Sequence, residues 1–221
     1  MKQAFFTLTA AALLLVSCQN APEADQASTS EVKEAAVATG DTLSIDRSGS
    51  TIGWIGTKTG GQHNGTFNIA NGMFTMADGN ITGGSFDIDI ASMQVVDLSG
   101  EDKGKLEGHL KSPDFFEADA YPTAKFEITS VSPFNAETSS SKLAGATHTI
   151  SGNLTLRGQT NNVSFPAIVK IEGNSVSAEA DFNIDRTKWG LNYKGPNNPA
   201  NWVIAKEVNL KLDVKANSGS L

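Results

Sequence analysis

The strongest constraint on the fold is the strict alternation of apolar and polar residues in several separate stretches. Apolar side chains occupy every second position from Val176 to Ile184, from Val208 to Val214, and from Phe86 to Ile90. Successive side chains of a β-strand point to opposite faces, so this pattern is typical of antiparallel strands with one dry and one wet face. The sequence therefore predicts an all-β protein with about eight or nine strands.

A sheet of this size has to cover its apolar face. Closing into a barrel does so and removes the exposed edges, although a two-sheet sandwich fits the alternation almost as well. One helical insertion is expected from Ser99 to Leu110. Ser99 and Asp102 have the spacing of a capping box, whereas Gly104 and Gly108 weaken the helix.

Residues 1–17 have the pattern of a lipoprotein signal peptide. Lys2 supplies the positive charge, and the apolar run Ala4 to Val16 is too short to span a membrane as a helix. The sequence from Leu15 to Cys18 resembles the bacterial lipobox, so Cys18 is the expected lipidation site, and several acyl chains would anchor the protein stably. The alternative is an ordinary secretory signal, which would leave an exported protein with one unpaired thiol.

Residues 18–40 are expected to form the lipidated N-terminus and a flexible linker, because they are rich in Ala, Ser, Thr and Glu and lack aromatic residues. Gln19 is not the Asp that commonly signals retention in the inner membrane. This favours a place in the cell envelope, on the outer membrane facing the periplasm. The acidic Glu23 and Asp25 leave export to the cell surface open. Residues 41–221 would then form a single barrel domain.

Charge and composition argue against several classes of function. The chain has 17 basic and 24 acidic residues and a net charge of −7, without a basic stripe, so nucleic acid is not an expected partner. His63, His109 and His148 lie in separate elements without the spacing of metal ligands, and no metal or other cofactor is expected. The carboxylates are scattered over the polar faces of strands and no Gly-x-Ser-x-Gly elbow is present, so no catalytic site is predicted.

Several landmarks occur in a characteristic order. They are the opening Asp46, the Gly65–Phe67 step, the helical segment Glu107–Phe116 with the following Tyr121–Ile128, and the strand and turn Ser151–Gly158. Over about residues 41–215 the chain resembles the YceI-like family of bacterial envelope proteins. That resemblance implies a lipocalin-like antiparallel eight-stranded β-barrel that binds isoprenoid or related lipid chains. One departure is Gly49, where many relatives carry a histidine, and a ligand-head or metal role at that position is in doubt.

The candidate ligand-binding residues come from the insertion and from the apolar faces of strands. The resemblance implies that the insertion borders the ligand tunnel, and of the adjacent Phe115 and Phe116 one is expected to face the lumen. Ala178 and Ala180 are small, which either leaves room for a ligand or relieves crowding where the barrel tapers. The predicted contacts are Leu110, Phe115, Phe116, Phe126, Ala178, Ala180, Phe182 and Trp189.

The turn from Asp185 to Gly190 has two interpretations. In the first, the turn is a rim at which Arg186 or Lys188 contacts the polar head group of a ligand, and Trp189 covers the mouth of the cavity. In the second, the turn is an ion-paired corner in which Trp189 fills one end of the barrel. The second is favoured, because a tryptophan usually buries its ring and hydrogen-bonds its N–H.

Together these features predict a lipid-anchored envelope protein that holds one long apolar ligand, a polyisoprenoid or a fatty-acid derivative, without catalysis. One alternative is a scaffold or stress-response lipoprotein whose barrel is filled by its own side chains. A second is an enzyme acting on an envelope lipid, which the missing catalytic constellation disfavours. The sequence determines neither the ligand nor the oligomeric state.

Overall fold

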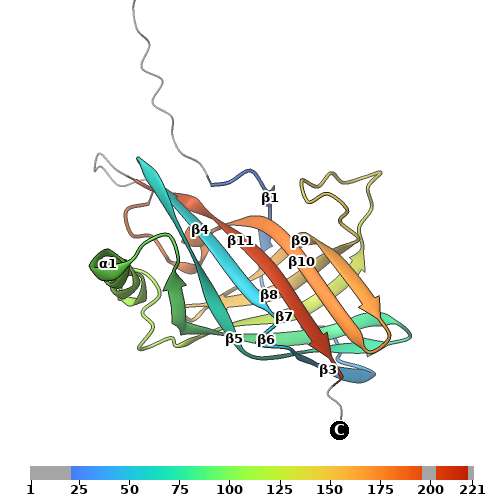
Figure 1. Ribbon diagram of the computed structural model, residues 1–221. Coiled ribbons are helices and arrows are strands. Elements are labelled where there is room, and N and C mark those ends of the chain that lie inside the picture. The colour runs from blue at the N-terminus through green and yellow to red at the C-terminus, as the bar shows by residue number, and fades with distance from the viewer. Residues whose placement is uncertain (1–20, 196–202, 219–221) are drawn as a thin grey trace, which may run out of the picture.

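The computed structural model describes residues 21–195 and 203–218. Eight antiparallel strands, β4 to β11, each pair with the next along the chain, and β11 pairs back with β4. This confirms the predicted closed eight-stranded barrel (Figure 1). The strands are β4 Thr51–Lys58, β5 Gly61–Ala77, β6 Asn80–Val95, β7 Thr123–Pro133, β8 His148–Leu156, β9 Gln159–Glu172, β10 Ser175–Asp185 and β11 Ile204–Asn217.

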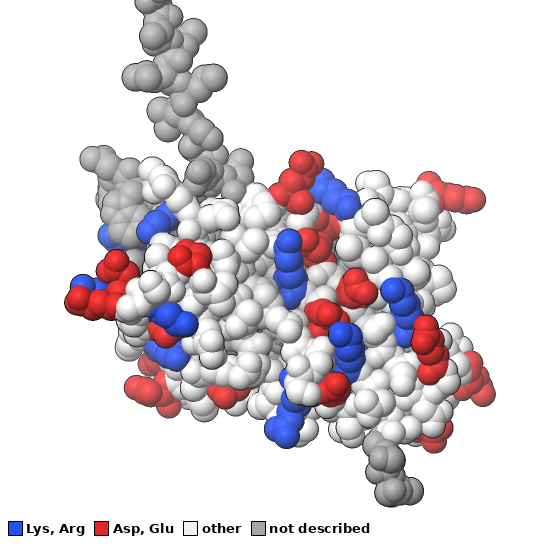
Figure 2. Space-filling view, viewed as in Figure 1, with Lys and Arg blue, Asp and Glu red and all other residues white. Residues whose placement is uncertain are grey.

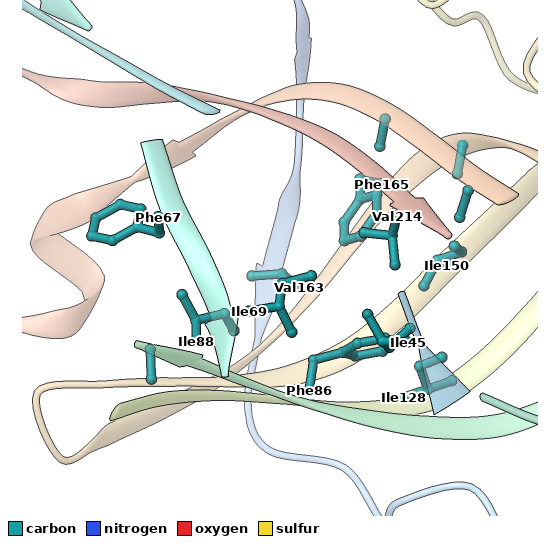
Figure 3. Close-up of a cluster of buried hydrophobic side chains, with 14 of the residues drawn as sticks. Ile45, Phe67, Ile69, Phe86, Ile88, Ile128, Ile150, Val163, Phe165 and Val214 are labelled. Atoms are coloured by element: carbon teal, nitrogen blue, oxygen red, sulfur yellow. The ribbon is translucent and has the colours of Figure 1, made fainter. Parts of the chain in front are cut away.

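The alternating residues point as the pattern predicts. On β10 the side chains of Val176, Ala178, Ala180, Phe182 and Ile184 are all buried. Figure 3 shows apolar side chains from strands all round the barrel, among them Phe67, Ile88 and Phe165, gathered on its inner side. The core of the protein is therefore the lumen of the barrel, as expected for an amphipathic sheet that closes on itself.

The helical insertion is α1, Gly100–Lys111, in the connection between β6 and β7 at one end of the barrel (Figure 1). Ser99 is the N-cap in an extended conformation, but its side chain makes no capping hydrogen bond, so the predicted capping box is wrong. The helix is instead held by Glu107, whose Oε1 accepts a hydrogen bond from the backbone N–H of Val95 at 2.8 Å. Leu106 and Leu110 pack half-buried against the core.

The short strand β3, Asp41–Ile45, continues the line of β4. β3 pairs with Met73–Met76 of β5 and with Ala216 and Asn217 of β11. These residues lie beyond the stretches of β5 and β11 that pair with β4. At that end of the barrel β3 therefore takes the place of β4 in the wall.

The predicted flexible linker is wrong for much of its length. Residues 22–39, here called the N-terminal strap, contain two short strands, β1 Asp25–Gln26 and β2 Ser28–Ser30. β1 pairs in parallel with β10, and β2 pairs antiparallel with β9. Further on, the backbone N–H of Ala36 donates to the carbonyl of Ile128 at 2.9 Å.

The geometry of β9 and β10 explains why the strap is ordered. These two strands pair directly only over Ile168–Glu172 and Ser175–Glu179, next to their hairpin. Beyond Glu179 the strap supplies backbone partners to both of them. Ala27, between β1 and β2, is only 4% exposed and belongs to the core. The strap thus completes the barrel wall where two strands separate.

The strap also covers polar side chains on the outer side of the wall. Asn183, expected on the wet face of β10, is buried, and its Nδ2 donates to the carbonyl of Pro22 at 2.9 Å. Asn153 Nδ2 donates to the carbonyl of Lys33 at 2.7 Å. Asn183 departs from its predicted exposure because a segment distant in sequence lies over it.

The predicted signal peptide, residues 1–17, and the predicted lipidation site Cys18 lie outside the described residues. Within residues 21–195 and 203–218 there is no helix with the length and apolar character needed to cross a membrane.

Candidate functional site: an apolar cavity in the barrel

The barrel encloses a cavity of about 310 Å³. Its walls come from strands β4 to β11, and α1 with the turn that follows it borders one end. The lining is overwhelmingly apolar, with Ile, Leu, Val and Phe side chains of the kind seen in Figure 3. A volume near the lower limit of about 300–1,000 Å³ for small-molecule sites leaves room for an apolar ligand.

Seven of the eight predicted contacts line this cavity. They are Leu110, Phe115, Phe116, Phe126, Ala178, Ala180 and Phe182. Phe182 stacks on Phe165 across β10 and β9, with ring centroids 4.0 Å apart and an angle of 8° between the planes. Ala178 and Ala180 lie on the same face of β10, and both are buried and border the cavity.

Phe115 and Phe116, both predicted contacts, border the cavity together, although only one of them was expected to face the lumen. They lie in a turn after α1 and not in a strand, so the alternation of a strand does not apply to them. The Phe116 ring meets Phe67 edge-on with centroids 5.6 Å apart. The Phe115 ring lies 5.2 Å from Tyr193, measured between centroids. The two rings thus form an aromatic rim over the end of the barrel near α1.

Trp189 does not line the cavity. It ends the short 3-10 helix η1, Arg186–Trp189, and is 0% exposed. Its Nε1 donates to the backbone carbonyl of Leu154 at 2.8 Å. This geometry matches the structural interpretation, in which Trp189 closes a corner of the wall, and not the interpretation as a ligand contact.

Arg186, at the start of η1, is a buried cation that borders the cavity. Its guanidinium donates to four backbone carbonyls, those of Leu191, Tyr193, Ile204 and Ala205. Burial lowers the pKa of Arg186 from its ordinary value, and the nearby Asp185 opposes that shift. The carbonyls satisfy the N–H groups, but they do not neutralise the charge.

A second polar group lies at the junction of β4 and β5. Lys58 Nζ is 3.0 Å from His63 Nε2, and His63 Nδ1 is 2.8 Å from Asp97 Oδ2. Burial opposes ionisation of Asp97, but hydrogen bonds from the backbone N–H of Asn64 and from His63 outweigh it and lower the pKa of that carboxyl. Lys58 and His63 both line the cavity. This group is not predictable from the sequence, because its members are separated by up to 39 positions and follow no motif.

The other two histidines are also hydrogen-bonded. His109 Nε2 lies 3.0 Å from Asp114 Oδ2, and His148 Nδ1 lies 2.8 Å from the hydroxyl of Thr147. Within the described ranges, no group of three or more His, Cys, Asp or Glu side chains is arranged to hold a metal ion.

The fold and the cavity define a class, a closed antiparallel barrel that encloses an apolar chamber, as lipocalin-type proteins do. Residues 43–216 match the model of the YceI-like domain, and the chain belongs to this family. The sequence is also similar to UPF0312 protein plu2095 of Photorhabdus laumondii subsp. laumondii, with 27% identity over 150 residues, which are 68% of this chain and 64% of that relative's length.

Two solved structures share the fold. BcnA of Burkholderia cenocepacia superposes with a TM-score of 0.60 and 19% identity, over 78% of this chain and 99% of its own. A polyisoprenoid binding domain of Saccharophagus degradans, implicated in plant cell wall breakdown, superposes with a TM-score of 0.55 and 16% identity, over 80% of this chain and 98% of its own. At these identities the similarity establishes the fold.

Proposed function

We propose that this protein binds one long apolar molecule, a polyisoprenoid or a fatty-acid derivative, inside the barrel. The observation that carries the proposal is the apolar cavity of about 310 Å³, bordered by the aromatic rim of Phe115 and Phe116. Burial of each CH2 group of a ligand contributes about 0.8 kcal/mol, so an extended chain gains affinity along its whole length. The structural neighbour described as a polyisoprenoid binding domain supports this choice of ligand class.

We further propose that the protein works in the cell envelope, on the outer membrane facing the periplasm, and is anchored through acyl chains on Cys18. The sequence from Leu15 to Cys18 and the preceding apolar run support the anchor. Binding, rather than catalysis, is the proposed role, because a carrier needs only a concave apolar site with a few polar groups at its mouth.

Native mass spectrometry of the purified protein tests the proposal against its two alternatives. A co-purified hydrophobic mass, released by organic solvent, is the result expected of a carrier. A protein that neither co-purifies with a lipid nor takes up added C15–C20 chains would be a scaffold, and turnover of an added envelope lipid would show an enzyme.

A variant that fills the cavity gives a matched comparison. Ala180 lines the cavity on β10, and replacing it with Phe adds bulk without polarity. We expect Ala180→Phe to fold with little loss of thermal stability while losing lipid uptake, because the ring enters free space. A barrel already packed solid would instead lose about 1–3 kcal/mol through overpacking. A strongly lowered melting temperature would therefore favour the scaffold.

A further inference from the structure

The charged residues that line the cavity are all of one sign. Lys58 and Arg186 border it, and no Asp or Glu belongs to its lining among the described residues. This is unexpected in a chain whose net charge is −7. A cation beside an apolar chamber is costly unless an opposite charge or several hydrogen bonds compensate it.

Lys58 is the cation whose donors are least used. An ammonium group only donates, so His63 Nε2 accepts from Lys58 Nζ over 3.0 Å, and the Nδ1–H of His63 donates to Asp97. His63 thus holds Lys58 Nζ in place as a neutral acceptor. The ammonium group has further N–H donors that this contact does not use. In the described ranges no carboxylate oxygen lies within 4.0 Å of Lys58 Nζ.

The same strand carries two further polar atoms that lack partners. Trp54 and Thr57 of β4 both line the cavity, and Trp54 Nε1 and Thr57 Oγ1 are buried without a hydrogen-bond partner. Both atoms have almost no accessible surface, so a ligand in the cavity does not reach them as they stand. Together with Lys58, they show that β4 supplies a polar part of an otherwise apolar lining.

We propose that the ligand ends in an anionic head group, a carboxylate or a phosphate, which binds at Lys58 while its apolar tail fills the barrel. Arg186, between β10 and β11, adds positive potential, because its Nη2 donates to the carbonyl of Ile204, and Ile204 of β11 pairs with Lys58 of β4. This inference rests on the proposed lipid-binding function and narrows its ligand class. Charge-assisted hydrogen bonds to oxyanions are stronger than neutral ones, so the head group would contribute both affinity and orientation.

Displacement of a fluorescent lipid from the full chain, at neutral pH, tests the head group with matched ligands. Palmitate is compared with hexadecanol, and farnesyl phosphate with farnesol, so that only the head differs within each pair. The wild type should bind one or both anions at least about 10-fold more tightly than the matching alcohol, as a charge-assisted bond predicts. Preference for palmitate identifies a carboxylate ligand, and preference for farnesyl phosphate identifies a phosphate ligand.

Lys58→Met retains the apolar stem of the side chain and removes the charge. It should lower the affinity for the preferred anion about 10-fold or more and leave the affinity for the alcohol unchanged. Lys58→Arg should keep the preference for the anion. The control is Lys211→Met, on the exposed side of β11, which does not line the cavity and should change neither affinity.

The outcomes separate this inference from the proposed function. Equal binding of anion and alcohol in the wild type would overturn the head-group assignment while leaving the lipid carrier in place. Equal losses for both ligands in Lys58→Met would also overturn it, because they would indicate a damaged barrel. Absence of binding to all four lipids would contradict the proposed function and the inference together.

Discussion

Phe182 shows how much a single side chain contributes to this barrel. It is 3% exposed, stacks face to face on Phe165 and at the same time lines the cavity. Stacked aromatic pairs contribute about 0.5–1.5 kcal/mol beyond the burial of their surface. The same residue therefore serves the stability of the wall between β9 and β10 and the shape of the binding chamber.

Phe182→Asp is expected to destabilise the domain by at least about 3 kcal/mol, because it removes the stacked ring and buries a charge without a partner. Urea denaturation followed by tryptophan fluorescence measures the change in the free energy of unfolding. Glu179→Gln is the matched control, because Glu179 is exposed on the same strand and should change that free energy by less than about 0.5 kcal/mol. Equal effects of the two variants would contradict the assignment of one dry face to β10.

The N-terminal strap is the element that most changes the architecture. It gives backbone partners to β9 and β10 where these strands no longer reach each other, so neither strand is left with an open edge there. Unpaired strand edges invite aggregation, and covering them is a common protection. The strap lies before residue 43, where the match to the family model begins.

Ala27→Arg should release the strap, because Ala27 is buried in the wall and has no room for a long charged side chain. We expect a lower melting temperature, and faster cleavage by protease between residues 22 and 39. Ser28→Arg, at the exposed neighbouring position, should leave both properties close to those of the wild type. A strap that stays resistant in Ala27→Arg would show that the wall does not depend on it.

Acid should weaken the attachment of the strap through Asp25. Desolvation raises the pKa of this carboxyl, but hydrogen bonds from the hydroxyl of Ser141 and the backbone N–H groups of Lys142 and Leu143, together with the charge of Lys142, outweigh it. The net pKa lies below its ordinary value of 3.8. A lowered pKa in the folded state stabilises the protein above the unfolded pKa, and this contribution is lost as the pH falls through the folded value.

The free energy of unfolding of the wild type should therefore fall more steeply below about pH 4 than that of Asp25→Asn, which lacks this titration. Chemical denaturation at a series of pH values measures the two slopes. Parallel slopes would mean that Asp25 does not hold the strap to the loop at residues 141–143.

The elements differ in how far the sequence predicted them. β10 and β11 follow directly from alternation, because each has an apolar face in the lumen and a polar outer face. The strap has the composition of a linker, because its strands are only two and three residues long and owe their order to the edges of β9 and β10, which no local pattern indicates. The contact of Lys58 with His63 follows no motif, since it depends on the β4–β5 hairpin that brings the two side chains together.

At the scale of the whole molecule, basic and acidic side chains are interspersed over the face shown in Figure 2. Attachment to a membrane is proposed to come from Cys18 rather than from the charge of this surface. Cys18→Ser should move the protein from the membrane fraction to the soluble fraction, while the melting temperature of the barrel stays unchanged. Fractionation of cells that express both forms measures this, and a serine variant that still sediments with membranes would contradict the proposed anchor.

The docked strap has a consequence for the distance between the barrel and the membrane. Among the described residues, the earliest hydrogen bond of the strap to the wall is at Pro22, whose carbonyl accepts from Asn183, and Pro22 is only four residues after Cys18. Four residues of fully extended chain reach at most about 14 Å, whereas an unattached segment from Cys18 to Asp41 could reach roughly 80 Å. With acyl chains on Cys18, the outer side of β10 would be held near the lipid surface. The distance between them would be at most about half the thickness of a bilayer's hydrocarbon core. The barrel would then stay close to the membrane, and the distance between the lipid surface and the cavity would be short. Its ligand would not have to cross the width of an aqueous compartment.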